Sequence, residues 1–181
     1  LHGTLVPAVE DKRLTHEDTV AAAQAIMSTV QRQKFSELME IDMAYSVPGL
    51  GRFRCNIYQQ RGTIGLALRV IPMRIKSFDE LGLPPVLSKI AEEERGLVLV
   101  TGTTGSGKST TLAAMVDHIN KVRSCHVMTV EDPIEFLHRD YRSLINQREV
   151  TVDTQSFSYA VRSALRQDPD VILVGEMRDL E

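Results

Sequence analysis

A short glycine-rich stretch that ends in a lysine and two hydroxyl residues carries the clearest chemistry in this sequence. It runs from Gly102 to Thr110 and fits the spacing G-x-x-x-x-G-K-[S/T]. Glycines let successive backbone N–H groups converge on phosphate oxygens, and the start of a following helix adds its positive end. We therefore predict a site for a nucleoside triphosphate, and for ATP in particular. The residues expected to contact it are Thr103, Thr104, Gly105, Ser106, Gly107, Lys108, Ser109 and Thr110.

Two side chains of this loop have distinct expected roles. Lys108 supplies a mobile point charge for the β- and γ-phosphates, and the Ser109 hydroxyl is placed to bind Mg²⁺. A chance glycine-rich turn is the alternative reading of such a pattern. The context argues against chance, because an apolar run, Leu97–Thr101, precedes the loop and a helical pattern over Lys108–Asn120 follows it. The apolar residues of that pattern are Leu112, Met115, Val116 and Ile119.

Carboxylates follow two further apolar runs that read as strands. His126–Val130 is followed by Glu131-Asp132-Pro133-Ile134-Glu135-Phe136, with three candidate carboxylates, and Val171–Val174 is followed by Gly175 and Glu176. Acids at the carboxyl ends of parallel strands lie where α/β folds bind ligands, and hydrolysis needs groups that hold Mg²⁺ and activate water. An aspartate is common where Gly175 stands, so the expected role near Mg²⁺ falls on Glu176. The first cluster could instead be a solvated acidic turn, and Asp168-Pro169-Asp170 favours a turn rather than a metal site.

Two units should position these groups. Residues 1–72 predict an α+β unit, with a helix capped at Thr15 and three alternating strands, the last of which places Ile64, Leu66, Leu68 and Val70 on one side. Residues 73–84 are rich in proline and glycine, include a candidate cap at Ser77–Glu80, and predict a linker. Residues 85–181 predict an α/β unit, in which parallel strands at Leu97–Thr101, His126–Val130 and Val171–Val174 carry helices on both faces.

The composition excludes some classes of protein. A net charge of −3 argues against a general nucleic-acid binder. The sequence has no run of 18 or more apolar residues, so we expect no transmembrane helix. Cys55 and Cys125 are expected to be reduced structural thiols. Both ends look cut, so we expect a fragment of a longer protein.

Four stretches of sequence resemble a known family, the secretion ATPases of type II and type IV pilus machines. They are Arg95–Gly102 leading into Gly105–Leu112, then Glu131–Phe136, Asn146–Val150 and Leu165–Asp179. Within this family the chain looks most like the retraction, or twitching-motility, branch. That choice depends on Gly107–Thr110, Pro133–Phe136, Gln147–Glu149 and Met177.

The resemblance implies a fold and a working assembly. Family members are hexameric ring motors in the cytoplasm, peripheral to the inner membrane at the pilus base, where they act on a platform protein. A PAS-like N-terminal domain would precede a RecA-like ATPase domain, and the linker would absorb motion between them.

The resemblance also implies roles for single residues. Glu135 would be the general base, and Glu176 would act at Mg²⁺ and the attacking water. Arg54 and Arg69 match by position the arginines that reach the nucleotide phosphates, although exposed arginines are mostly solvated. Alternatives stay open: a pilus assembly or type II secretion ATPase, a nucleotide-dependent switch with little turnover, and a nucleic-acid motor, which the acidic balance disfavours.

Overall fold

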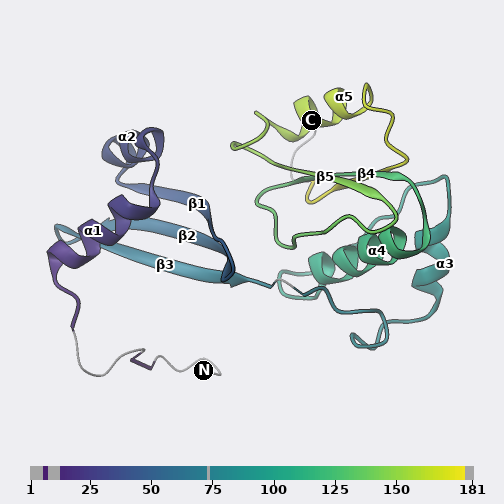
Figure 1. Ribbon diagram of the computed structural model, residues 1–181, viewed down its shortest axis with the longest axis horizontal. Helices are drawn as coiled ribbons and strands as arrows, with labels where there is room; N and C mark the ends of the chain where they lie inside the picture. The colour runs from purple at the N-terminus through teal and green to yellow at the C-terminus, as the bar shows by residue number, and fades with distance from the viewer. Residues whose placement is uncertain (1–5, 8–12, 73, 178–181) are drawn as a thin grey trace. The chain divides into compact units, whose positions relative to one another are not determined.

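The chain divides into two compact units, residues 1–71 and 72–181 (Figure 1). The computed structural model describes residues 6–7, 13–72 and 74–177. Arg178 and Asp179, the last residues of the stretch that resembles secretion ATPases, lie outside the described residues, as does Met73 of the predicted linker.

The first unit packs two helices on one face of a three-stranded antiparallel sheet (Figure 1). Its elements are α1 (His16–Ile26), α2 (Thr29–Leu38), β1 (Glu40–Val47), β2 (Gly51–Gln60) and β3 (Thr63–Ile71). α1 begins where its sequence predicts, because the Thr15 hydroxyl accepts from the Asp18 N–H and the Asp18 carboxylate accepts from the Thr15 N–H. The core of this unit is formed by Ala23, Met27, Met43, Cys55 and Ile57.

The predicted apolar face of β3 is only partly covered. Ile64 and Leu66 pack against the core, but Leu68 is 51% exposed and Val70 is 65% exposed. At the end of the strand it is Ile71 that is buried. The 11 residues of α1 span about 16 Å. The nine residues of β3 span about 30 Å. α1, the helix that packs on β3, is therefore too short to cover the whole strand, which alternation alone does not reveal.

The second unit is an α/β fold around a parallel sheet, which confirms the α/β class predicted for it. Its elements are α3 (Val86–Glu92), α4 (Lys108–Val122), β4 (His126–Glu131), β5 (Leu144–Glu149), α5 (Phe157–Ala164) and β6 (Val171–Val174). The strand order is β5-β4-β6, and α4 and α5 lie on opposite faces of the sheet (Figure 1). β5 was not predicted because its sequence, Leu-Ile-Asn-Gln-Arg-Glu, is mostly polar.

The prediction of a strand at Leu97–Thr101 is wrong. These residues form no strand, and Leu97 is 82% exposed. A strand exists through hydrogen bonds to a neighbour, and the described sheet pairs β5, β4 and β6 only. β6 is consequently an edge strand of the described sheet and is half-buried, although its sequence predicts a fully buried one.

Helix α4 runs antiparallel to β4, and this orientation places the phosphate loop. Met115, Val116 and Ile119 pack on Val127, and only residues 123–125 separate the end of α4 from the start of β4. With 15 residues α4 is about 22 Å long. With six residues β4 is about 20 Å long. The N-terminal end of α4 therefore lies beside the carboxyl end of β4.

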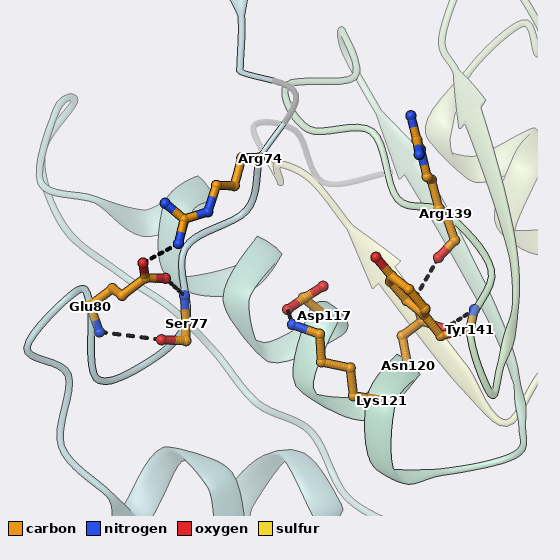
Figure 2. Close-up of polar contacts among 8 residues, drawn as sticks. All are labelled: Arg74, Ser77, Glu80, Asp117, Asn120, Lys121, Arg139 and Tyr141. Carbon is orange, nitrogen blue, oxygen red and sulfur yellow. Dashed lines mark hydrogen bonds and ion pairs between the residues drawn. The ribbon is translucent and has the colours of Figure 1, made fainter.

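A buried asparagine fastens the other end of α4. Asn120 is fully buried; its amide donates to the Arg139 carbonyl at 2.7 Å, and its oxygen accepts from the Tyr141 N–H at 3.1 Å (Figure 2). The same oxygen also accepts from the Ser143 N–H at 3.3 Å. These contacts hold the loop that leads into β5. Burial on α4 also includes Asp117, so the helix is covered more completely than its apolar pattern predicts.

Replacing Asn120 with alanine should destabilise the second unit. The change leaves two N–H groups and one carbonyl without partners, and each unsatisfied buried group costs roughly 1–3 kcal/mol. We expect the free energy of unfolding, measured by urea titration with circular dichroism, to fall by about 3 kcal/mol in total. Arg142→Ala, at an exposed position of the same loop, is the control and should change it by less than about 0.5 kcal/mol. Equal losses in both variants would contradict the role of Asn120.

Part of the predicted linker is fastened to the second unit. The Ser77 N–H donates to the Glu80 carboxylate at 2.9 Å, the Glu80 N–H donates to the Ser77 hydroxyl at 3.3 Å, and Arg74 pairs with Glu80 (Figure 2). The predicted cap thus closes a turn instead of starting a helix. Phe78 packs on the core beneath it, with its ring 5.3 Å from that of His118.

Candidate functional site

The phosphate loop has the backbone geometry that its glycines were expected to provide. Gly102, Gly105 and Gly107 have φ values of 153°, 80° and 95°, which disfavour residues with a side chain. A Cβ atom at position 102 would also lie 2.6 Å from the Ser106 Oγ. The loop is therefore specified both by conformation and by close packing of its two ends.

Lys108 is the first residue of α4, and its ammonium group is held over the loop. Its Nζ donates to the carbonyl oxygens of Gly102 and Thr103 at 2.9 and 3.0 Å. Ser109 follows as the second helical residue and is half-buried. A positive charge, a hydroxyl and a helix N-terminus thus converge, and this combination favours an anion such as a phosphate chain.

Acidic residues lie at the same edge of the sheet because β4 and β6 are adjacent and parallel. Val130 pairs with Val174, so Glu131 and Gly175 are the next residues on the two strands. The Gly175 N–H donates to the Val130 carbonyl at 2.8 Å. A Cβ at position 175 would lie 3.3 Å from the Cα and Cγ of Glu131, which explains a glycine where an aspartate is common. Glu176 follows directly and is half-buried.

Glu131 is the residue that sequence reasoning undervalued in this cluster. Its carboxylate accepts from the Thr129 hydroxyl at 2.6 Å, from the Gln147 amide at 3.2 Å and from the Glu135 N–H at 3.4 Å. Burial raises the pKa of Glu131, and the hydrogen bonds partly offset the effect of burial. The side chain of Glu135, the predicted base, is exposed to solvent.

Strand β5 supplies the groups that hold the acidic loop. Gln147 donates to the Phe136 carbonyl at 2.8 Å and accepts from the His138 N–H at 2.8 Å. The Glu149 carboxylate, which is buried, accepts from the Ile134 N–H at 3.1 Å. Burial lowers the pKa of His138 to about 4, although nearby Asp117 acts in the opposite direction. The polar side chains of β5 are the reason that the strand was not predicted. The same side chains, Gln147 and Glu149, hold the loop in place.

The two candidate arginines of the first unit lie directly opposite each other. Arg54 on β2 pairs with Arg69 on β3, and both are exposed on the face away from the core. Like charges in directly opposed positions repel, so this face has the charge to receive an anion. The structure places the two residues together, and their predicted contact with nucleotide stays a prediction.

The predicted Mg²⁺ ligands do not form a cage of protein groups. Among the described residues, no cluster of three or more His, Cys, Asp or Glu side chains could hold a metal ion. Mg²⁺ rarely needs such a cluster, since it keeps several waters and shares phosphate oxygens in nucleotide sites. A hydroxyl at Ser109 and a carboxylate at Glu176 are oxygen ligands of the kind that it prefers.

Fold and site together define a phosphate-loop α/β protein: a glycine-rich loop opens a helix whose N-terminus faces the carboxyl edge of a parallel sheet. Residues 60–181 match the family described as type II/IV secretion system protein. The chain therefore belongs to the type II/IV secretion system protein family.

Several similar proteins have names that refer to the type IV pilus or to twitching motility. The type IV pilus retraction ATPase PilT of Pseudomonas aeruginosa is 52% identical over 168 residues, which cover 93% of this chain and 49% of that protein. A twitching motility protein of Neisseria gonorrhoeae is 48% identical, with coverage of 93% and 45%. The crystal structure of the pilus retraction motor PilT with bound ADP matches with a TM-score of 0.88 at 52% identity, over 91% of this chain and 48% of that one. The chain spans about half the length of the curated relatives that it matches.

In the described residues, 6–7, 13–72 and 74–177, no helix combines the length and the apolar character that a membrane crossing requires.

Proposed function

We propose that this chain is the nucleotide-binding part of an ATP-hydrolysing motor subunit that powers type IV pilus retraction. One observation carries the proposal: α4 begins with Lys108 at the same edge of the sheet where β4 and β6 end in Glu131 and Gly175-Glu176. A triphosphate bound at the loop would have its γ-phosphate directed toward these carboxylates. Similarity to a retraction ATPase and to a twitching motility protein supports the particular motor.

Each residue of the site has a defined task in this proposal. Residues 103–110 bind the phosphates through their N–H groups, and Lys108 neutralises charge on the β- and γ-phosphates. Ser109 and Glu176 would hold Mg²⁺, which neutralises charge on the transferred phosphoryl group when it is bound. Glu135 accepts the proton of the attacking water and orients it for in-line attack. Its exposed side chain is free to turn toward a bound nucleotide.

The finer assignments of fold and assembly belong to the same proposal. We take the second unit as RecA-like and the first as PAS-like, with Arg54 and Arg69 directed to nucleotide phosphates. The whole protein would form a homo-hexamer in the cytoplasm, at the inner-membrane base of the pilus, and would act on the platform protein there. The opposed arginines support this view, because an anion would relieve their repulsion.

A nucleotide-dependent switch with little turnover is the second candidate. Gly175 favours it, because this position lacks a carboxylate that many related sites use. Steady-state phosphate release by the whole protein with ATP and Mg²⁺ separates the two. Sustained release at about 1 s⁻¹ or faster, the lower end of typical turnover numbers, is expected for the motor. A single stoichiometric burst would support the switch.

An experiment in cells distinguishes a retraction ATPase from an assembly ATPase. Cells whose own protein carries Lys108→Ala should keep surface pili but lose twitching, because retraction and not assembly would be blocked. Electron microscopy and motility on agar are the measurements. Loss of the pili themselves would identify an assembly ATPase instead.

A further inference from the structure

Glu131 lies at a junction of three segments that meet at the carboxyl edge of the sheet. It ends β4, and the chain that leaves β6 passes so closely that a Cβ on Gly175 would lie 3.3 Å from the Cα and Cγ of Glu131. Its Oε2 accepts from the Glu135 N–H at 3.4 Å. A single residue thus bonds the loop that carries Glu135 and lies beside Gly175, the residue that precedes Glu176.

The carboxylate of Glu131 is itself fixed from two strands. Its Oε1 accepts from the hydroxyl of Thr129, which is fully buried, at 2.6 Å and from the Gln147 amide at 3.2 Å. Gln147 is in turn fixed by its bonds to the Phe136 carbonyl and the His138 N–H. All three groups around the carboxylate are donors, which matches the acceptor-only character of an ionised glutamate. The side chain is therefore a rigid support and is not free to rotate toward solvent.

Glu135 by contrast has an exposed side chain, and its position depends on its backbone. The loop after β4 is held at Ile134 by Glu149, at Glu135 by Glu131, and at Phe136 and His138 by Gln147. Of these bonds among the described residues, the one from Glu131 acts on the predicted base itself. A shift of about 1 Å at a catalytic group can cost 10²-fold in rate, so this support has kinetic weight.

We infer that Glu131 is a positioning residue for ATP hydrolysis, which holds Glu135 at its distance from Glu176. The inference rests on the proposed function, since it assigns both carboxylates to the reaction. Glu131 acts through the backbone of its neighbours and needs no contact with nucleotide. It should consequently influence turnover and leave nucleotide affinity unchanged.

The kinetic test compares four forms of the whole protein: the parent, Glu131→Gln, Glu135→Ala and the double variant. Glu131→Gln keeps the size of the side chain but turns an N–H₂ group toward a donor. We expect it to lower kcat by roughly 10- to 100-fold with KM for ATP and affinity for ADP within about twofold. In the Glu135→Ala background the same change should cost less than about threefold, because the residue through which it acts is gone. A further loss of tenfold or more in that background would overturn the inference, as would an unchanged kcat in the single variant.

Two additional measurements keep the inference testable if Glu131→Gln folds poorly or if the parent does not turn over. Thr129→Val removes one bond to Glu131 with little change in shape, and it should lower kcat in the same direction by a smaller factor. Glu94→Gln, at an exposed position, is the control for the loss of one charge. Amide hydrogen exchange, measured by NMR on the 181-residue chain, reports how firmly the Glu135 amide is held and does not require that the protein hydrolyses ATP. The Glu135 amide should exchange at least about tenfold faster in Glu131→Gln, the change for about 1.4 kcal/mol.

The outcomes separate the two proposals. A parent protein that releases no phosphate contradicts the proposed function, while a faster Glu135 amide would still support the positioning role of Glu131. Equal amide exchange in parent and variant contradicts the positioning role even if the parent is an active ATPase.

Discussion

Lys108→Ala should abolish measurable nucleotide binding. The ammonium group is the only side-chain cation of the phosphate loop, and it bonds the Gly102 and Thr103 carbonyls at its mouth. Its removal takes away charge-assisted contacts to phosphate and loosens the loop that presents the backbone donors. A loss of about 3 kcal/mol corresponds to at least 100-fold weaker affinity. Isothermal titration calorimetry with ADP and ATP is the measurement.

Lys121→Ala is the matched control for that experiment. Lys121 belongs to the same helix but lies in its last turn, where it pairs with Asp117 at 2.6 Å. It should leave nucleotide affinity within about twofold of the parent value, since Lys121 lies at the opposite end of α4 from the phosphate loop. If Lys108→Ala bound ADP as tightly as Lys121→Ala, the loop would not be the nucleotide site.

Glu135→Ala should spare nucleotide binding and slow hydrolysis by about 100-fold or more, the scale expected for loss of a general base. The side chain is exposed and its backbone is held by Glu131, so its removal should leave the loop folded. Steady-state phosphate release by the whole protein gives kcat, and calorimetry gives the affinity for ADP.

Asp132→Asn provides the comparison within the same acidic turn. Asp132 is also exposed, and it was one of the three candidate carboxylates. The variant should keep most of the parent rate. Hydrolysis at the parent rate by Glu135→Ala, together with a slow Asp132→Asn, would show that the base assignment is wrong.

The features that the sequence predicts well are specified within a few residues of chain. The phosphate loop needs glycines where φ is positive, and α4 begins at Lys108 because the loop ends there. The capping box of Thr15 and Asp18 is equally local. Alternation over β2 identifies Cys55 and Ile57 as core because one helix layer covers that face.

The features that were missed depend on a partner far along the chain. Leu97–Thr101 has the composition of a buried strand but no neighbour among the described strands, while polar β5 becomes a strand because β4 lies beside it. The buried Asn120 side chain is hydrogen-bonded to carbonyl and N–H groups about 20 residues away along the chain. In the sequence Glu131 is one of three neighbouring acids, and it is distinguished from the others by the pairing of β4 with β6.

The fastened turn at Ser77–Glu80 also limits how far the two units can separate. β3 ends at Ile71, and Ser77 is bonded within the turn whose Phe78 packs on the second core. Six residues of fully extended chain reach about 20 Å, so the connection is a short tether and not a long flexible spacer. Displacement of one unit beyond that reach must pull on the other.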